Sequence, residues 1–191
     1  MQELRTALLV LLALTGVTGV AYPLLVTGIA QVLFPRQANG SLVEVDGKAL
    51  GSALIGQPFD EPGYFWSRPS ATGRFPYDAA ASSGSNLAPT NDKLLEAVGA
   101  RVEALRAADP GNAAPTPVDL VTASSSGLDP HVSPAAARFQ AGRVARERGF
   151  PPARVEALIE EHTEGRWLGL LGERRVNLLA LNLALDRAAP R

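Results

Sequence analysis

The most extended hydrophobic stretch of the sequence lies near its start. No residue between Arg5 and Arg36 is charged, and the apolar core of this stretch runs from Ala7 to Val32. As an α-helix this core is about 39 Å long, whereas the hydrocarbon of a bilayer is about 30 Å thick. The pattern predicts a short tail (residues 1–5), a single transmembrane helix (residues 6–34) and a soluble domain (residues 35–191).

A cleaved signal peptide is the competing interpretation, because Gly19-Val20-Ala21 resembles a small-x-small cleavage site. The apolar residues continue past that site through Ile29 and Leu33, which favours a retained anchor. Charge gives little indication of orientation, since Glu3 offsets Arg5. The simpler topology places the N-terminus in the cytoplasm and the soluble domain outside the cell membrane.

Small residues interrupt the predicted span. Thr15 and Gly19 form a small-xxx-small pair, Gly16 and Gly28 add positions where another backbone could approach closely, and Pro23 loosens the middle. Glycine is common in membrane helices, so a plain anchor is the alternative. We expect Gly16 and Gly19 to lie at a contact with another helix.

Shorter patterns divide the first half of the soluble part. Two apolar runs around Asp46-Gly47 predict a β-hairpin. Residues 57–89 are rich in proline, glycine, serine and aromatic side chains, which predicts a long irregular segment of functional or interfacial character. A helix is expected from about Asn91 to Ala108, with a buried stripe of Leu94, Leu95, Val98, Val102 and Leu105.

In the second half of the soluble part, the sequence predicts a further series of strands and helices. They are a buried strand over 118–123, a helix from Ser133-Pro134 to Arg148, a helix near 153–163 with His162 at the core edge, a short strand over 167–172, and a buried helix over 175–187. Asn177 and Asn182 in that last helix need hydrogen-bond partners. Strands and helices mix without strict alternation, so the fold class is α+β (mixed α/β) after one N-terminal transmembrane helix.

Composition excludes several functions. The net charge is −1, so the chain offers no basic face for nucleic acid. Cysteine is absent and only two histidines occur, which argues against thiol chemistry and against a bound metal ion. The spacing in "GSALIGQ" resembles a phosphate-binding loop, but Gln57 and Pro58 stand where lysine and a hydroxyl are needed.

The segment "SSSGLDPHVSP" (residues 124–134) places serine, aspartate and histidine close together. A serine hydrolase draws its triad from different elements of the fold, and no G-x-S-x-G elbow occurs. We interpret the segment as a structural corner in which Gly127 supplies a permissive backbone, Asp129 bonds nearby donors and Ser133 caps a helix. The rival hypothesis is a membrane-tethered hydrolase that uses Ser126 or Ser133 with His131.

Aromatic and basic residues alternate in "YFWSRPSATGRFPY". This mixture, which includes Trp66 and Arg68, is typical of protein interfaces. Nucleic acid would need a positive charge that the chain lacks.

Together with the apolar helix, the ordered motifs "LIGQPF", "YFWSRPSAT", "SSGSNLAPTN", "VDLVTASSSGLDPHVSPAAARFQAGRVA" and "LGERRVNLLALNLAL" resemble the KdpC family, the C subunit of the bacterial potassium-transporting Kdp P-type ATPase. The resemblance covers nearly the whole chain. Ser83, Ala88 and Ser125 stand where the family commonly has glycine, and Leu178 where it often has valine.

The resemblance implies an accessory, non-catalytic subunit of a high-affinity potassium uptake pump in the cell membrane. Its implied partners are a channel-like potassium-binding subunit, a P-type ATPase subunit, a small single-helix subunit and membrane lipid. ATP, magnesium and potassium are used by the complex, and no cofactor is assigned to this chain, which lacks the D-K-T-G-T phosphorylation sequence.

The resemblance implies one of two roles. The first is a catalytic chaperone that raises the ATP affinity of the ATPase subunit, and this role is the reason that the family is described as ATP-binding. The second is an assembly factor or an outer cap at the site of potassium entry. An external domain cannot contact cytosolic ATP, so we favour the second. We expect the loops around Trp66, Asn86 and Asp129 to dock on partner subunits.

Overall fold

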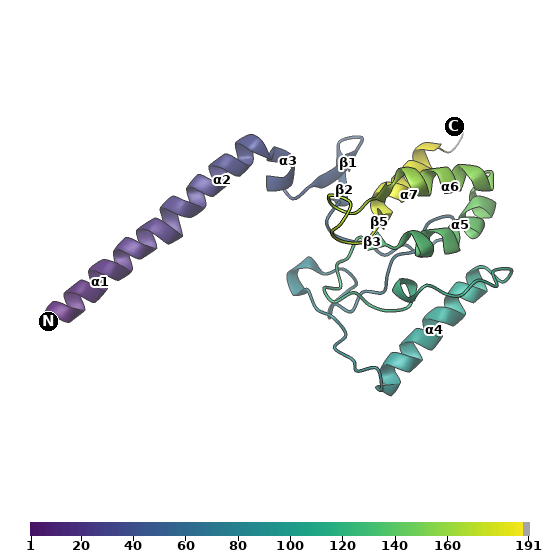
Figure 1. Ribbon diagram of the computed structural model, residues 1–191, viewed down its shortest axis with the longest axis horizontal. Coiled ribbons are helices and arrows are strands. Elements are labelled where there is room, and N and C mark those ends of the chain that lie inside the picture. Colours follow the sequence, from purple (N-terminus) through teal and green to yellow (C-terminus); the bar gives the residue numbers. More distant parts are fainter. Residues whose placement is uncertain (189–191) are drawn as a thin grey trace. The chain divides into compact units, whose positions relative to one another are not determined.

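A computed structural model describes residues 1–188 of the chain. The chain forms two compact units, the first from Met1 to Ser52 and the second from Ala53 onward. Figure 1 labels helices α1 to α7 and strands β1, β2, β3 and β5.

The first unit begins with one continuous helix. It consists of α1 (Gln2–Leu14), a π-helical stretch η1 (Thr15–Ala21) and α2 (Tyr22–Leu33). No residue from Gln2 to Leu33 is buried, and the helix is long and apolar enough to cross a membrane. The predicted N-terminal apolar helix is therefore confirmed, although it starts at Gln2 because the polar residues before Thr6 also adopt helical geometry.

Proline explains the π-helical stretch. Pro23 has no N–H to donate to the carbonyl of Gly19, four residues earlier, and its ring crowds that carbonyl. The helix widens just before it, and the N–H of Tyr22 donates to the carbonyl of Val17. Such bulges are frequent at functional sites. Here the widened turns contain Thr15, Gly16 and Gly19.

A hairpin completes the first unit after the short helix α3 (Pro35–Ala38). Strands β1 (Leu42–Val45) and β2 (Lys48–Ser52) pair in antiparallel fashion. Asp46 and Gly47 both have positive φ angles, 51° and 74°, as a two-residue type I′ turn requires. The predicted hairpin is confirmed.

The second unit combines helices with a small antiparallel sheet, which confirms the α+β class. In chain order its elements are η2 (Ala79–Ala81), α4 (Asp92–Ala108), η3 (Val118–Leu120), β3 (His131–Val132), α5 (Pro134–Arg148), α6 (Pro152–Glu161), β4 (Thr163–Glu164), β5 (Arg175–Asn177) and α7 (Leu178–Ala188). The strand order is β3-β5-β4.

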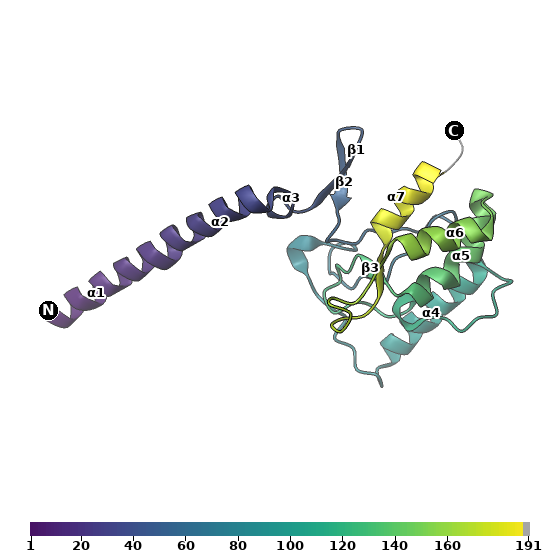
Figure 2. The same cartoon turned by 45° about the horizontal axis from the view of Figure 1, so that its top comes forward.

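The core lies where α5, α6 and α7 pack beside this sheet (Figure 2). Helix α5 contributes small residues that allow close packing, and α6 and α7 contribute larger aliphatic ones. The fully buried members include Ala136, Ala137, Val144, Val155, Ile159, Leu181 and Leu185. Phe65, from the irregular segment, is also fully buried and joins this segment to the core.

The predicted helix boundaries are confirmed by their caps. The Ser133 side chain accepts a hydrogen bond from the N–H of Ala136, and Pro134 occupies the first turn of α5. Gly149 ends α5 with a left-handed φ of 65°. The Asn91 side chain caps α4 through the N–H of Lys93. These signals are local, so the sequence displays them directly.

Two predicted strands are wrong, and one predicted helix begins three residues later than expected. Residues 118–123 form a short 3-10 helix and a turn instead of a buried strand, since Leu120 is buried whereas Val118 is 69% exposed. Residues 167–172 form an exposed turn closed by one bridge between Trp167 and Leu171. Residues 175–177 form the central strand β5, and the helix starts only at Leu178. These three residues form a strand because β3 and β4 pair with them on either side, and this pairing outweighs local helix propensity.

The buried stripe of α4 is less covered than predicted. Of its five apolar residues only Leu105 is buried, Leu94, Val98 and Val102 are half-buried, and Leu95 is 59% exposed. By contrast, Val155, Leu158 and Ile159 of α6 are buried. His162 lies half-buried at the end of that helix, where its Nδ1 bonds the Leu158 carbonyl.

Candidate functional site

The segment 124–134 forms the corner that the sequence predicted, and it does so through its own side chains. Ser124 Oγ accepts from the N–H of Gly127 (2.9 Å), and Ser126 Oγ accepts from the N–H of Leu128 (3.1 Å). Asp129 Oδ1 accepts from the N–H of His131 (3.0 Å). Each polar side chain thus closes a turn of its own backbone.

An ion pair fixes the corner to the irregular segment. Arg68 Nη1 donates to Asp129 Oδ2 at 2.9 Å, and His131 Nδ1 lies 3.4 Å from Asp129 Oδ1. Burial raises the pKa of the Asp129 carboxyl, but hydrogen bonds from His131 and the charge of Arg68 outweigh burial, so this pKa lies below its ordinary value. Asp129 is therefore an ionised structural anchor at neutral pH.

The same corner is bonded to residues 70–83. Ser70 Oγ donates to the carbonyl of Gly127 (2.7 Å), and Ser83 N–H donates to the carbonyl of Ser126 (3.0 Å). Tyr77 donates its hydroxyl to the carbonyl of Arg68 (2.6 Å), and burial raises the pKa of that hydroxyl. These contacts make the corner and the irregular segment one structural body.

The backbone of this region tolerates little change. Gly127 has a φ of 68°, and a Cβ at this position would lie 2.7 Å from the Ser83 carbonyl oxygen and from Thr72 Cγ2. Asn86 also has a left-handed φ, 53°, which asparagine adopts more readily than most residues. Ser83, Ala88 and Ser125, which stand where the family commonly has glycine, have no such φ.

The serines of the corner are not arranged as hydrolase nucleophiles. Ser133 accepts from Ala136 N–H as a helix cap, and both its N–H and its hydroxyl donate to the Asp119 carboxylate (2.6 and 3.2 Å). Within the described chain, no hydrogen bond joins Ser126 or Ser133 to the His131 ring. No group of three or more possible ligands gathers around a metal position in this part either.

Asn177 connects the corner to the sheet. It stands opposite His131 in the antiparallel pairing of β3 with β5. Its Nδ2 donates to the carbonyl of Ala53 (2.8 Å), and its Oδ1 accepts from Ala180 N–H (3.1 Å). The predicted need for partners is met by backbone groups at both ends of the side chain.

The aromatic segment 64–66 is held between two helices by side-chain amides. Asn182 of α7 bonds both backbone groups of Phe65, and Gln140 of α5 bonds both backbone groups of Trp66. All four bonds measure between 2.7 and 3.2 Å. The two amides act as a strand would on each side of an extended backbone.

A buried arginine, Arg143 of α5, supports the same segment. Its guanidinium lies 4.6 Å from the centre of the Trp66 ring and donates to the carbonyls of Pro62 and Tyr64 and to Gln140 Oε1. Burial lowers the pKa of Arg143 to about 10. The carbonyl oxygens and the ring face stabilise the charge.

Arg148, five residues further along the chain, holds the start of the aromatic segment. It donates to the Gly63 carbonyl and to Asp186 Oδ1, each at 2.8 Å, and lies 4.3 Å from the Tyr64 ring centre. Burial lowers the pKa of Arg148, but the hydrogen bonds that Arg148 donates to Asp186 and Tyr64 outweigh burial, so this pKa lies above its ordinary value.

The structure therefore brings seven of the predicted residues together in two groups. Arg68, Gly127, Asp129, His131 and Asn177 share the corner. Trp66 and Asn182 belong to the second group, in which the side-chain amides of Gln140 and Asn182 bond the backbone of residues 65 and 66; this group is the amide clamp. Gly16 and Gly19 lie in the first unit, and Asn86 is exposed. Sequence reasoning missed Gln140 and Arg143. Their signal was their place, three residues apart, on the apolar face of α5 with Ala136, Ala137 and Val144.

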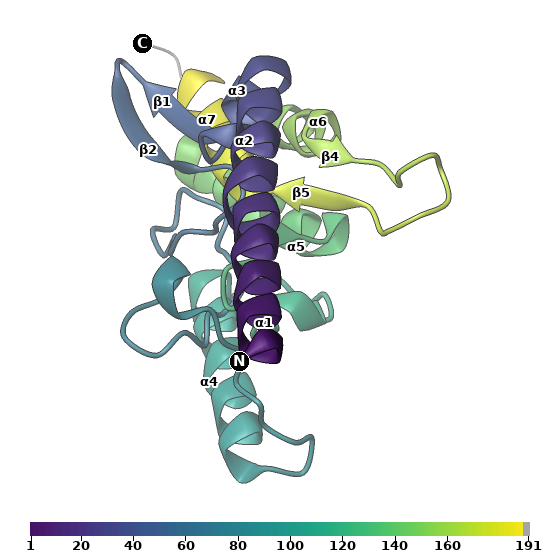
Figure 3. The same ribbon diagram turned by 90° about the vertical axis from the view of Figure 1, so that its left-hand side faces the viewer.

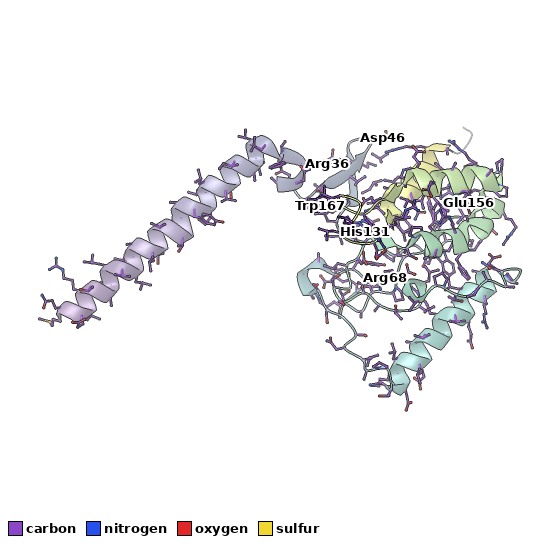
Figure 4. All side chains as sticks on the ribbon, viewed as in Figure 1. Arg36, Asp46, Arg68, His131, Glu156 and Trp167 are labelled. Carbon is purple, nitrogen blue, oxygen red and sulfur yellow. The ribbon has the colours of Figure 1, made fainter. Side chains whose placement is uncertain are left out.

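An open depression adjoins the corner. Its volume is about 720 Å³, and its lining includes Arg68, Asp129, His131, Trp167 and Leu171. Of these residues, Arg68, His131 and Trp167 are labelled in Figure 4. Salt-bridged and hydrogen-bonded side chains form its polar part, and the exposed turn at 167–171 forms its apolar part.

The fold and site define a class: a protein whose described residues contain one helix of membrane-spanning length and an α+β unit in which polar side chains bond one another and the backbone. A family model described as "KdpC: K+-transporting ATPase, c chain" matches residues 4–187. The chain therefore belongs to the KdpC family.

Named relatives agree with this assignment. A "Potassium-transporting ATPase KdpC subunit" of Polaromonas naphthalenivorans is 65% identical over 98% of this chain and 95% of its own length. The protein of the same name from Sorangium cellulosum is 66% identical over 97% of this chain and 98% of its own. That from Methylococcus capsulatus is 66% identical over 95% and 96%.

Proposed function

We propose that this protein is a non-catalytic accessory subunit of an ATP-driven potassium uptake complex, required for the assembly and activity of the pump. The observation that carries the proposal is the family match over residues 4–187, together with relatives named as subunits of a potassium-transporting ATPase. The proposed partners are a channel-like potassium-binding subunit, a P-type ATPase subunit and a small single-helix subunit.

The apolar helix is proposed to anchor the chain in the cell membrane with the N-terminus in the cytoplasm and the soluble domain, residues 35–191, outside. In this topology the residues that precede the helix lie on the cytoplasmic side and the domain lies on the opposite side. The topology separates the domain from cytosolic ATP, which favours a role in assembly or at potassium entry over direct contact with nucleotide.

The widened turns of the helix are proposed to pack on the channel-like partner. Side chains are absent at Gly16 and Gly19, so another helix could approach the backbone there. A Cβ at Gly19 would meet only Thr15 Cγ2, at 3.7 Å, and one at Gly16 would meet nothing within 4 Å. A larger side chain at Gly19 would therefore not clash with other residues of this chain. A loss of partner recovery after this substitution would then indicate that another helix contacts Gly19.

The loops around Trp66, Asn86 and Asp129 are proposed to support docking of the domain on the outer loops of the partners. The amide clamp and the Arg68–Asp129 pair keep this surface in one conformation, which lowers the entropy lost on association. The hydrolase alternative has no comparable support, because the hydroxyl of Ser133 is already engaged by Asp119 and Ala136.

Purification of the tagged chain in mild detergent from cells that express its native operon tests the proposal. We expect a D-K-T-G-T-bearing ATPase and a large polytopic protein to accompany it, with potassium-stimulated ATP hydrolysis. Recovery of the chain alone, under conditions that keep other membrane complexes intact, would contradict the proposal.

The helix contact has its own test in the same purification. We expect Gly19→Leu to reduce recovery of the partners, whereas Val17→Leu, which enlarges an already exposed side chain of the same helix, should leave recovery unchanged. Equal recovery with both variants would remove the helix from the proposed interface.

A further inference from the structure

The loop between β4 and β5 has an apolar tip whose large side chains are exposed instead of packed in the core. The loop, residues 166–172, is called the Trp167 loop below. It exposes four large apolar side chains: Trp167 (68%), Leu168 (75%), Leu170 (81%) and Leu171 (58%). Figure 3 shows the loop projecting away from α5, α6 and α7. Grouped exposed apolar side chains of this kind mark interaction sites.

The backbone of the Trp167 loop is ordered rather than loose. Trp167 N–H donates to the Leu171 carbonyl at 2.8 Å, and Leu171 N–H donates back to the Trp167 carbonyl at 3.0 Å. Between them, Leu168 and Gly169 have left-handed φ angles of 52° and 75°. A leucine in that conformation is strained, and strain of this kind concentrates at functional sites. The turn presents its side chains outward in a fixed arrangement.

Charged side chains surround the loop in neutral pairs. Arg166 bonds Glu173 (2.8 Å), Arg175 bonds Glu164 (2.8 Å), and Arg174 bonds Glu160. An anionic lipid surface attracts basic residues that lack such partners. An apolar centre with a neutral polar rim rich in arginine is instead the composition of a protein–protein interface.

The loop also borders the depression described above. Trp167 and Leu171 line its apolar side, and Arg68, Asp129 and His131 line its polar side. A lipid headgroup layer does not supply a shaped projection that fills such a hollow. A protein surface can both fill the hollow and receive the apolar tip.

We propose that the Trp167 loop and the adjoining depression form one docking site for another protein subunit. The partner surface would carry an uncharged apolar pocket for the side chains of Trp167 and Leu170, and beside it a projecting segment with hydrogen-bonding groups that enters the depression. The inference rests on the proposed function, in which this domain faces the outer loops of a polytopic partner, and it assigns the contact to a specific segment.

Site-specific photocross-linking in native membranes tests this site. A benzoylphenylalanine residue replaces Leu170 in one variant and Leu95 in a control, because Leu95 is also well exposed (59%) but lies on α4. We expect position 170 to give a covalent adduct with another protein subunit at a yield at least ~10-fold above that of position 95, as hot-spot contacts are confined to a few residues. An adduct with lipid only, with a second copy of this chain, or equal yields at both positions would overturn the proposal.

A second measurement uses the double variant Trp167→Ser/Leu170→Ser and the control Leu95→Ser. Because these side chains are exposed, we expect the thermal midpoint of the purified chain to stay within about 2 °C of wild type, while partner recovery falls at least ~10-fold for the double variant alone. Unchanged recovery would overturn the site. If wild type itself recovers no partner, the proposed function fails instead, so the two failures are distinguishable.

Discussion

Asn182 and Phe65 bond each other twice: Phe65 N–H donates to Asn182 Oδ1 at 3.0 Å, and Asn182 Nδ2 donates to the Phe65 carbonyl at 3.1 Å. Both residues are buried, at 1% and 0% exposure. The pair joins α7 to a segment more than a hundred residues earlier in the chain. The two hydrogen bonds satisfy the backbone N–H and carbonyl of Phe65, which are buried away from solvent.

Replacing Asn182 with leucine should therefore destabilise the domain strongly. The variant leaves the N–H and carbonyl of Phe65 without partners in the core, at about 1–3 kcal/mol each. We expect a loss of roughly 2–6 kcal/mol for the two groups together, measured by urea unfolding with tryptophan fluorescence. The control Ala180→Leu places the same side chain at an exposed position of α7 and should change stability by less than about 0.5 kcal/mol. Similar effects for both variants would contradict the role of the pair.

Gly127→Ala should cost more than Gly149→Ala. Both glycines have left-handed φ angles, 68° and 65°, but only at Gly127 would a Cβ collide with neighbouring atoms. We expect a loss of about 1–2 kcal/mol at Gly149 from backbone strain and a further ~1–3 kcal/mol at Gly127 from overpacking. Thermal unfolding of the two purified variants measures the difference. Equal losses would show that the corner can move away from residues 72–83.

The hydrogen bonds from His131 to Asp129, together with the ion pair of Asp129 with Arg68, should make stability depend on pH in the acid range. Since the pKa of Asp129 is lower in the folded chain than its ordinary 3.8, the unfolded chain binds the proton first as pH falls. The stabilisation is complete above that ordinary value and is lost as pH falls through the lower folded pKa.

We therefore expect Asp129→Asn to be less stable than wild type at pH 7, and the gap to narrow from about pH 5 downward. Urea unfolding at a series of pH values measures the gap. Asp60→Asn, which removes one carboxylate at an exposed position, serves as the control and should change stability at pH 7 by less than about 0.5 kcal/mol. A gap for Asp129→Asn that is independent of pH would assign the effect to packing instead of ionisation.

The proposed topology can be tested cleanly because the chain contains no cysteine. A single cysteine at exposed Ala114 should react in intact cells, from which the outer membrane has been permeabilised where present, with a maleimide that cannot cross the cell membrane. A single cysteine at Gln2 should react only after lysis. The reverse pattern would place the domain in the cytoplasm and restore direct contact with nucleotide as an explanation of its role.

Errors in the predicted elements have a common physical origin. The segment 118–123 is apolar enough for a strand, but no strand among residues 1–188 pairs with it, and residues 118–120 form a 3-10 helix that buries Leu120. Val176 and Asn177 lie in a run of good helix formers, yet they form a strand because β3 and β4 flank them. Pairing between distant segments outweighs local propensity in both places.

The sequence by itself determined the features that depend on neighbours in the chain. The apolar run from Ala7 to Val32 defines the membrane-length helix, Asp46-Gly47 defines the hairpin turn, and Ser133 and Gly149 define the ends of α5. Each follows from hydrogen bonds or steric limits within a few residues.

Only the tertiary structure decided which polar side chains work together. The sequence showed that Asn177 and Asn182 need partners, but not that the partners are the backbones of Ala53 and Phe65. It gave no sign that Arg143 stacks on Trp66 inside the protein. A buried amide or guanidinium is tolerated only where another part of the chain supplies a hydrogen-bond partner. Here the packing of α5 and α7 around residues 64–66 places those partners.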